Sequence, residues 1–159
     1  MSVSYWLDPL RHEHPPLQTQ ARTEVAVIGG GLCGASAAYH LATQGIEVTL
    51  VEARTISESA SGRNAGFLLQ GTAERYSRAV GLMGREKAQR IHAWSLENHR
   101  RIAERIQDDA IQCEYQKRGS LQLAGSPEEE KELIESADLL NQDGFDAVFV
   151  EQKQLAPAL

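Results

Sequence analysis

Three consecutive glycines, Gly29–Gly31, separate an apolar run from an alanine-rich stretch, and this junction constrains the fold more than any other part of the sequence. The apolar run, residues 24–28, predicts a strand buried on both faces. Residues 35–44 have helical composition, and Gly45 is well placed to end that helix. Residues 46–51 are rich in β-branched side chains and predict a second strand. Together they predict a strand–helix–strand unit with parallel strands and a right-handed crossover.

The glycines follow the spacing Gly29-x-Gly31-x-x-Gly34. In a dinucleotide-binding turn the first glycine permits the tight bend, the second lets the backbone approach a pyrophosphate, and the third lets the helix pack on the strand. The helix N-terminus then presents unpaired N–H groups to the phosphates. Glu52 ends the second strand, where an acid about 20 residues beyond the glycines accepts ribose hydroxyls. A turn that serves packing alone is the alternative, but the order of strand, helix, strand and acid favours a dinucleotide site.

The acid also narrows the choice of dinucleotide. A carboxylate at Glu52 would repel a 2′-phosphate, which disfavours NADP. The glycines alone do not separate NAD from FAD. The loop that follows, SASGRNAGFLLQG at residues 59–71, is long and rich in serine and glycine. Loops of that length in compact domains are more often functional than idle.

Three regions are predicted along the chain. Residues 1–23 are interrupted by prolines and predict an irregular N-terminal arm. Residues 24–110 predict the N-terminal part of a nucleotide-binding domain, mostly helical from residue 74 and divided near Gly81 and Gly84. Residues 111–159 predict the start of a second, α+β domain.

This second region has its own local signals. Residues 112–116, 120–124 and 147–150 each predict a short strand. Between the second and third of these, Ser126 precedes a proline and three glutamates, a strong helix start. That helix is predicted to run to Gln142 and to stop at Gly144.

Composition excludes several function classes. The formal net charge is −6, which argues against nucleic acid or an anionic membrane as a partner. No apolar run is long enough to span a bilayer, and the first residues do not resemble a signal peptide. Cys33 and Cys113 fit neither a disulfide framework nor a zinc site, so a reducing cytoplasm is expected. His12 and His14 lack a third ligand nearby, so no metal site is predicted.

The sequence resembles the D-amino-acid-oxidase-like (DAO) family of FAD-dependent oxidoreductases, and within it the γ-glutamylputrescine oxidase branch. The resemblance is carried by VAVIGGGLCGASAAYHLATQGIEVTLVEA at residues 25–53 and by ASGRNAGF at residues 60–67. SYWL at residues 4–7, GSLQLAGSPEEEKEL at residues 119–133 and QLAPAL at residues 154–159 extend it. It implies an α/β fold: a Rossmann-type FAD-binding βαβ unit with a helical segment, followed by the first, incomplete elements of an α+β substrate domain.

The resemblance also implies roles for individual residues. The glycine turn would hold the FAD pyrophosphate, Glu52 the adenosine ribose, and Arg54 would lie beside the adenine end. Residues 61–66 would pass along the pyrophosphate and ribityl chain toward the flavin. Arg63 would either stabilise negative charge on the reduced ring or pair with a phosphate or a surface acid. The full set of implied cofactor contacts is Gly29, Gly30, Gly31, Gly34, Glu52, Ala53, Arg54, Ser61, Gly62, Arg63, Asn64, Ala65 and Gly66.

The implied reaction is oxidation of a C–N bond of a small-molecule amine or amino acid. A neutral amine would transfer a hydride to the flavin, and water would hydrolyse the resulting imine. Members of the family are much longer, so this chain is expected to be the N-terminal part of an enzyme and inactive alone. The remainder of the enzyme or a partner chain would complete the fold. The alternatives are a non-catalytic nucleotide-binding fragment and an NAD-dependent dehydrogenase, which would require an incidental SASGRNAG loop.

Overall fold

The structure is a computed structural model, and it describes Ser4 and residues 14–155. The prediction of an N-terminal arm therefore falls largely outside the described residues, as do most of SYWL and the last four residues of QLAPAL. The described residues before β1 form no helix or strand. The chain divides into two compact units, Met1–Phe67 and Leu68–Leu159.

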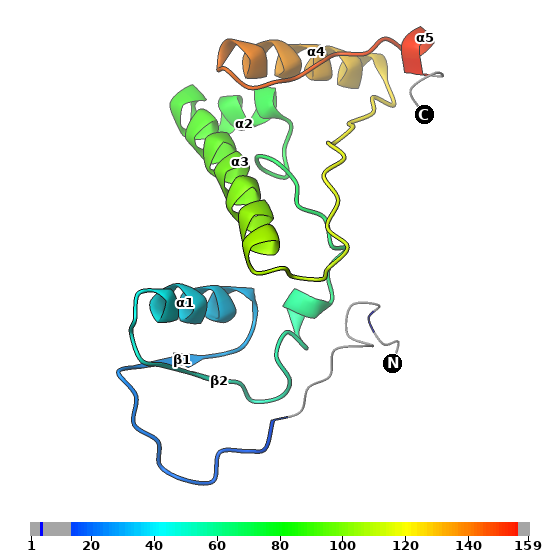
Figure 1. Cartoon of the computed structure of the whole chain (residues 1–159). Helices are drawn as coiled ribbons and strands as arrows, with labels where there is room; N and C mark the ends of the chain where they lie inside the picture. The colour runs from blue at the N-terminus through cyan, green and yellow to red at the C-terminus, as the bar shows by residue number, and fades with distance from the viewer. Residues whose placement is uncertain (1–3, 5–13, 156–159) are drawn as a thin grey trace. The chain divides into compact units, whose positions relative to one another are not determined.

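The first unit contains the predicted strand–helix–strand arrangement (Figure 1). Strand β1 (Val25–Ile28) leads into helix α1 (Leu32–Thr43), and strand β2 (Val48–Val51) returns beside β1. The strands are parallel, with Val25 opposite Val48 and Ile28 opposite Val51. Gly34, Ala38 and Leu41 of α1 are half-buried, whereas most other residues of the helix are exposed. These three residues therefore form the covered face of α1, which contacts both strands.

The ends of α1 and β2 differ slightly from the prediction. Helix α1 begins at Leu32, directly after the glycines and three residues before the predicted start at residue 35. At the other end, the N–H of Ile46 donates to the carbonyl of Leu41 at 3.2 Å. Ile46 therefore belongs to the helix terminus, and β2 starts two residues later. Gly45 lies just past the helix with φ +79°, as its predicted role requires.

The second unit is helical. Helix α2 (Tyr76–Met83) and helix α3 (Arg85–Asp108) are divided at Gly84, whose φ is +85°. Helix α4 (Pro127–Gln142) packs against α2, and the short helix α5 (Gln152–Leu155) follows. The core of this unit consists of buried residues of α2 and α3 with partly buried side chains around them: Tyr76, Ala79, Ala88, Val80, Met83, Leu139, Leu140 and Phe145.

The start of α4 confirms the predicted cap. The hydroxyl of Ser126 accepts the N–H of Glu129 at 3.3 Å, and the Glu129 carboxylate accepts the N–H of Gly125 at 2.7 Å. The pair resembles a capping box, but Glu129 accepts the N–H of the residue before the N-cap and not that of Ser126 itself. The helix ends at Gln142, followed by Gly144 at φ +86°.

The prediction of three strands in this unit is wrong. Residues 112–116, 120–124 and 147–150 form no strand in the structure. A two-stranded hairpin is marginal by itself, and within residues 14–155 the only sheet is the β1–β2 pair. The strand pattern is present in the sequence, but no neighbouring sheet is available to pair with it. Within the described part of the chain, the second unit therefore has no α+β character.

Among the described residues of both units, no helix has the length and apolar character needed to cross a bilayer.

Candidate functional site

At two positions of the glycine turn between β1 and α1, Gly29 and Gly34, a side chain would be strained or would clash. Gly29 has φ +100°, a conformation that disfavours every side chain. Its N–H donates to the carbonyl of Val51 at 2.7 Å, which ties the turn to β2. A Cβ built on Gly34 would lie 1.8 Å from the backbone oxygen of Gly29. Gly34 therefore allows the closest approach of α1 to the turn, as its position in the spacing predicts.

Gly30, between them, is buried. A Cβ at this position would lie 2.4 Å from Cδ1 of Ile56 and 3.3 Å from Cβ of Glu52. Its N–H donates to Oε2 of Glu52 at 2.7 Å, and its carbonyl accepts the N–H of Ser57 at 3.0 Å. The sequence pattern did not identify Ile56 and Ser57, because nothing local in a serine-rich loop reveals a contact with a turn more than twenty residues away.

Glu52 faces the glycine turn. Oε2 accepts from Gly30 as described, and Oε1 accepts the N–H of Arg54 at 3.0 Å. The hydrogen bond from Gly30, then that from Arg54, and a smaller one from Ala53 hold the pKa of the Glu52 carboxyl below its usual value. Glu52 is therefore an anion at neutral pH. A carboxylate has about four lone-pair sites, so each oxygen keeps capacity for a further donor such as a ribose hydroxyl.

The N-terminus of α1 meets the 3₁₀ helix η2 (Ala60–Gly62). The N–H of Leu32 donates to Oγ of Ser61 at 2.8 Å. Gly31, the N-cap residue, has no side chain to offer, and a Cβ there would lie 3.2 Å from the same oxygen. Gly62 is buried, and its carbonyl accepts the hydroxyl of Ser4 at 2.6 Å. The structure thus brings the two predicted sequence motifs, the glycine turn and SGRNAG, together.

The remaining predicted residues lie on the same loop and bind mainly to one another. Arg54 donates to Oγ of Ser59 at 2.7 Å. Arg63 donates through Nε to the carbonyl of Glu58 at 2.9 Å, so its described partner is a backbone carbonyl and not an acid side chain. Asn64 donates to the carbonyl of Ser61 at 2.6 Å and accepts the N–H of Gly66 at 2.8 Å. Ala65 is exposed, and Gly66 has φ +76°.

This geometry fits an adenosine diphosphate group. A side chain at Gly30 or Gly34 would clash with Ile56, Glu52 or the Gly29 carbonyl, so only glycine allows the turn to bend as tightly as a dinucleotide-binding turn does. In the described part of the chain, no partner is found for the Gly31 N–H at the tip of α1. An anionic carboxylate borders the other side of the turn. The turn therefore joins the positive end of α1, with its open N–H at Gly31, to a carboxylate that can accept hydroxyl groups.

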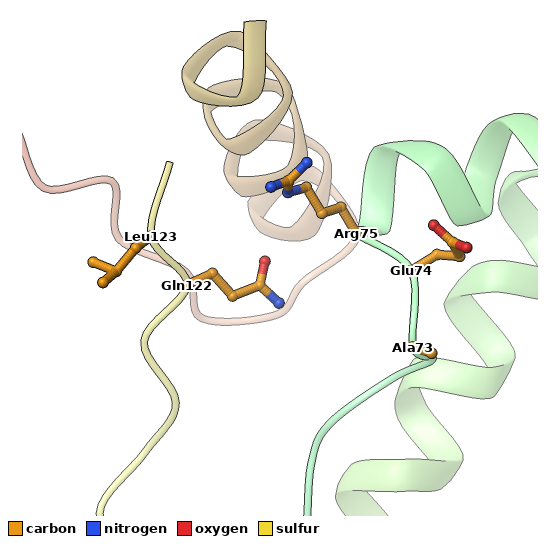
Figure 2. Close-up of a pocket in the computed structure, with 5 residues that line it drawn as sticks. All are labelled: Ala73, Glu74, Arg75, Gln122 and Leu123. Carbon is orange, nitrogen blue, oxygen red and sulfur yellow. The ribbon is translucent and has the colours of Figure 1, made fainter. Parts of the chain in front are cut away.

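A separate hollow lies in the second unit, with a volume of about 400 Å³ (Figure 2). Its lining residues come from the segment before α2 and from the extended segment before α4: Ala73, Glu74, Arg75, Gln122 and Leu123. Its cation, Arg75, lies 3.2 Å from the carboxylate of Glu129 and 2.6 Å from that of Glu132. Because both acids engage this guanidinium, the hollow has no charge left for an anionic ligand.

Metal-ligand side chains do not cluster in the part of the chain that the structure describes: no three His, Cys, Asp or Glu residues are arranged to hold an ion. His12 lies outside the described residues. Cys33 and Cys113 are both exposed free thiols.

Comparison with known proteins gives one family and several relatives. The profile of the FAD dependent oxidoreductase (DAO) family matches residues 24–159. A probable oxidoreductase OrdL of Haemophilus influenzae is 35% identical over 134 residues, which cover 83% of this chain and 31% of the relative. The gamma-glutamylputrescine oxidoreductase of Escherichia coli is 37% identical over 100 residues, covering 60% of this chain and 22% of the relative.

A third relative is the 4-methylaminobutanoate oxidase (formaldehyde-forming) of Paenarthrobacter nicotinovorans, 30% identical over 132 residues that cover 82% of this chain and 14% of the relative. The chain thus spans less than a third of the length of these three relatives. No solved structure gave a significant match.

Proposed function

Because the chain belongs to the DAO family of FAD-dependent oxidoreductases, we propose that it forms the FAD-binding portion of an enzyme that oxidises a C–N bond of an amine or amino acid. FAD is the expected cofactor of the family, and when bound it supplies the electron acceptor for this oxidation. The observation that carries the proposal is the junction of the tight glycine turn, the anionic Glu52 and the Ser61 loop. An NAD-dependent dehydrogenase is disfavoured by the family match.

The proposed cofactor contacts follow the geometry of the turn. The N–H of Gly31 and the positive end of α1 would hold the pyrophosphate, and Glu52 would accept the ribose hydroxyls. Ala53 and Arg54 follow at the adenine end. Residues 61–66 would run along the pyrophosphate and ribityl chain. We propose that Arg63 leaves the carbonyl of Glu58 to face the flavin or a phosphate when the cofactor binds.

The amine substrate is proposed from the relatives. One relative is named for gamma-glutamylputrescine and another for 4-methylaminobutanoate, both of which carry an amine. The substrate of this chain is proposed to be a small amine or amino acid of that kind. No residue of this chain is assigned to the substrate.

The domain organisation is part of the same proposal. Residues 24–110 would belong to the FAD-binding domain, and residues 111–159 would begin the substrate-binding domain. The segments at 112–124 and 147–150, which have the strand pattern but no sheet to join, would pair with the remainder of the enzyme or with a partner chain. The exposed free thiols are consistent with a reducing, cytoplasmic location.

The first experiment is an equilibrium titration of the 159-residue chain with FAD, NAD and NADP, followed by flavin fluorescence or by calorimetry. We expect saturable binding of FAD and none of NADP. Glu52→Ala should weaken FAD binding about tenfold, the scale of a lost charge-assisted hydrogen bond. Glu47→Ala is the matched control, because Glu47 is an exposed acid just before the same strand. Absence of FAD binding by the chain would contradict the proposal.

The second experiment concerns turnover. We expect the FAD-loaded chain not to reduce a dye with amines, because it spans less than a third of its relatives. Addition of the remaining part of the enzyme should restore amine-dependent reduction. If the completed enzyme binds FAD but reduces no dye with any amine or amino acid, a non-catalytic nucleotide-binding role is favoured instead.

A further inference from the structure

Helix α1 receives its cap from a distant residue. Its own N-cap, Gly31, makes no side-chain hydrogen bond. Instead, Oγ of Ser61, which lies 29 residues after Leu32, accepts the Leu32 N–H at 2.8 Å. A serine hydroxyl that accepts a first-turn N–H performs the chemistry of an N-cap, although it comes from another segment.

The bond to Ser61 is one of three hydrogen bonds that join the loop after β2 to the glycine turn and the start of α1. The other two are the bond from Gly30 to the Glu52 carboxylate and the bond from the Ser57 N–H to the Gly30 carbonyl. Ser57 has φ +62°, a strained conformation for a serine. Such strain persists only where the surrounding contacts over-determine the backbone. The loop is therefore joined to the glycine turn by contacts within the protein itself.

We propose that Ser61 is a positioning residue: its hydroxyl caps α1 and thereby holds η2 and the following loop against the glycine turn before any cofactor binds. Asn64 and Ser4 extend this hold, because both bind carbonyls of η2. Binding of a diphosphate then meets an ordered loop, so less conformational entropy is lost at that step. The part that concerns the cofactor rests on the proposed function.

The chemistry of a hydroxyl explains the choice of residue. Aspartate is an equally good cap, but its negative charge would repel a diphosphate at the same helix end. The serine oxygen accepts the Leu32 N–H and keeps its own proton free, so it adds no charge. Ser61→Asp should therefore retain the order of the loop and lose the cofactor, whereas Ser61→Ala should lose the order of the loop.

The first test is hydrogen exchange of the cofactor-free chain. In Ser61→Ala we expect the amides of residues 57–66 and of the first turn of α1 to exchange about tenfold faster, the effect of a lost cap. Ser61→Thr and Ser61→Asp should restore the protection. Ser59→Ala is the control: its hydroxyl binds Arg54 on the same loop but does not reach α1. Unchanged protection in Ser61→Ala, or an equal loss in Ser59→Ala, would overturn the proposal.

The second test is FAD binding measured by flavin fluorescence. Ser61→Ala should bind about tenfold more weakly and Ser61→Thr nearly normally, while Ser61→Asp should bind more than about a hundredfold more weakly despite an ordered loop. Normal FAD binding by Ser61→Asp would overturn the charge argument. If the wild-type chain binds no FAD, the proposed function fails, and hydrogen exchange still decides whether Ser61 holds the loop.

Discussion

The two units bury different kinds of residue. Among the described residues, the buried positions of Met1–Phe67 are glycines, Gly30 and Gly62. In Leu68–Leu159 the buried positions carry side chains: Tyr76, Ala79, Ala88, His92 and Ser136. The first unit is therefore shaped by close approach of backbone, and the second by packing of side chains. In the glycine turn, both backbone groups of Gly30 are hydrogen-bonded within the protein, and it is the N–H of Gly31 that has no partner among the described residues.

The polar groups follow the same division. In the first unit, Glu52 and Ser61 bind backbone N–H groups of the turn and remain partly accessible. In the second, Asp143 has a 6% exposed side chain and accepts the Tyr76 hydroxyl at 2.5 Å and Arg85 Nε at 2.8 Å. Asp143 thus joins α2, the start of α3 and the end of α4. The first set of bonds shapes a site, and the second holds a core together.

The pKa shifts in the second unit agree with this structural role. Burial, followed by the bond to Asp143, raises the pKa of the Tyr76 phenol. Burial acts to raise the pKa of Asp143 as well, but the hydrogen bonds from Tyr76 and Arg85 outweigh it and lower the pKa below its ordinary value. His92 packs against Tyr76 and Phe145, with ring centroids 5.5 Å and 4.5 Å away, and burial lowers its pKa.

The largest effect is expected from the same substitution made once in each unit. Gly34→Ala places a Cβ 1.8 Å from the Gly29 oxygen, so α1 must move away from the turn. We expect a loss of about 3 kcal/mol or more in the first unit and loss of FAD binding. Thermal unfolding by circular dichroism and an FAD titration measure the two results.

Gly81→Ala is the counterpart in α2. A Cβ there meets nothing within 4 Å, and glycine is a poor helix former, so we expect stabilisation by up to about 1 kcal/mol. If both substitutions cost the same stability, close backbone approach does not distinguish the first unit from the second.

The features of the two units that the sequence predicts are those determined by residues close together in the chain. The sequence predicts the strand–helix–strand order and the Ser126 cap, and both are confirmed. Each depends on residues within a few positions of one another, where the backbone needs of Gly29 or the cap at Ser126 follow from residue type.

The contacts that the sequence did not predict join distant segments. Ile56 over Gly30, and Tyr76 with Asp143, 67 residues away, follow from packing and not from any local pattern. The prediction of strands at 112–116, 120–124 and 147–150 is wrong because a strand pattern is local, whereas a strand forms only beside a hydrogen-bonding neighbour. Cofactor contacts at Glu52 and residues 61–66 stay predictions.

The next largest loss of stability is expected at Asp143, which joins α2, α3 and α4 in the second unit. Asp143→Ala leaves the Tyr76 hydroxyl without its acceptor in the core and removes the carboxylate partner of Arg85, which keeps its bond to Gln142. We expect a loss of about 2–3 kcal/mol in the free energy of unfolding. FAD affinity, measured at a temperature where the variant is folded, should be unchanged. A variant that keeps its stability but binds FAD weakly would reverse the roles assigned to the two units.

A smaller effect is expected at the N-cap of α4. Ser126→Ala removes the acceptor of the Glu129 N–H and should cost about 1 kcal/mol, measured by urea unfolding. Ser126→Asp is the matched control, because aspartate caps as well as serine and should restore stability. At this helix, unlike α1 in the proposal for Ser61, both residues should serve equally in every assay. A deficit in Ser126→Asp would therefore separate charge from capping at α4.

The smallest effect is the acid dependence that Asp143 gives to the second unit. Its folded pKa is lowered, so its contribution to stability is complete well above the unfolded value of about 3.9 and is lost as the pH falls through the folded pKa. Between pH 7 and pH 4 the loss should therefore be less than about 0.4 kcal/mol, growing below pH 4.

Urea unfolding of the wild type and of Asp143→Asn at each pH isolates this contribution, since asparagine does not titrate. The difference in stability between the two proteins should narrow as the pH falls, because protonation of Asp143 weakens its bonds to Tyr76 and Arg85. A difference that widens on acidification would mean that burial outweighs both hydrogen bonds. In that case Asp143 would be a strained charge in the core and not the node that joins three helices.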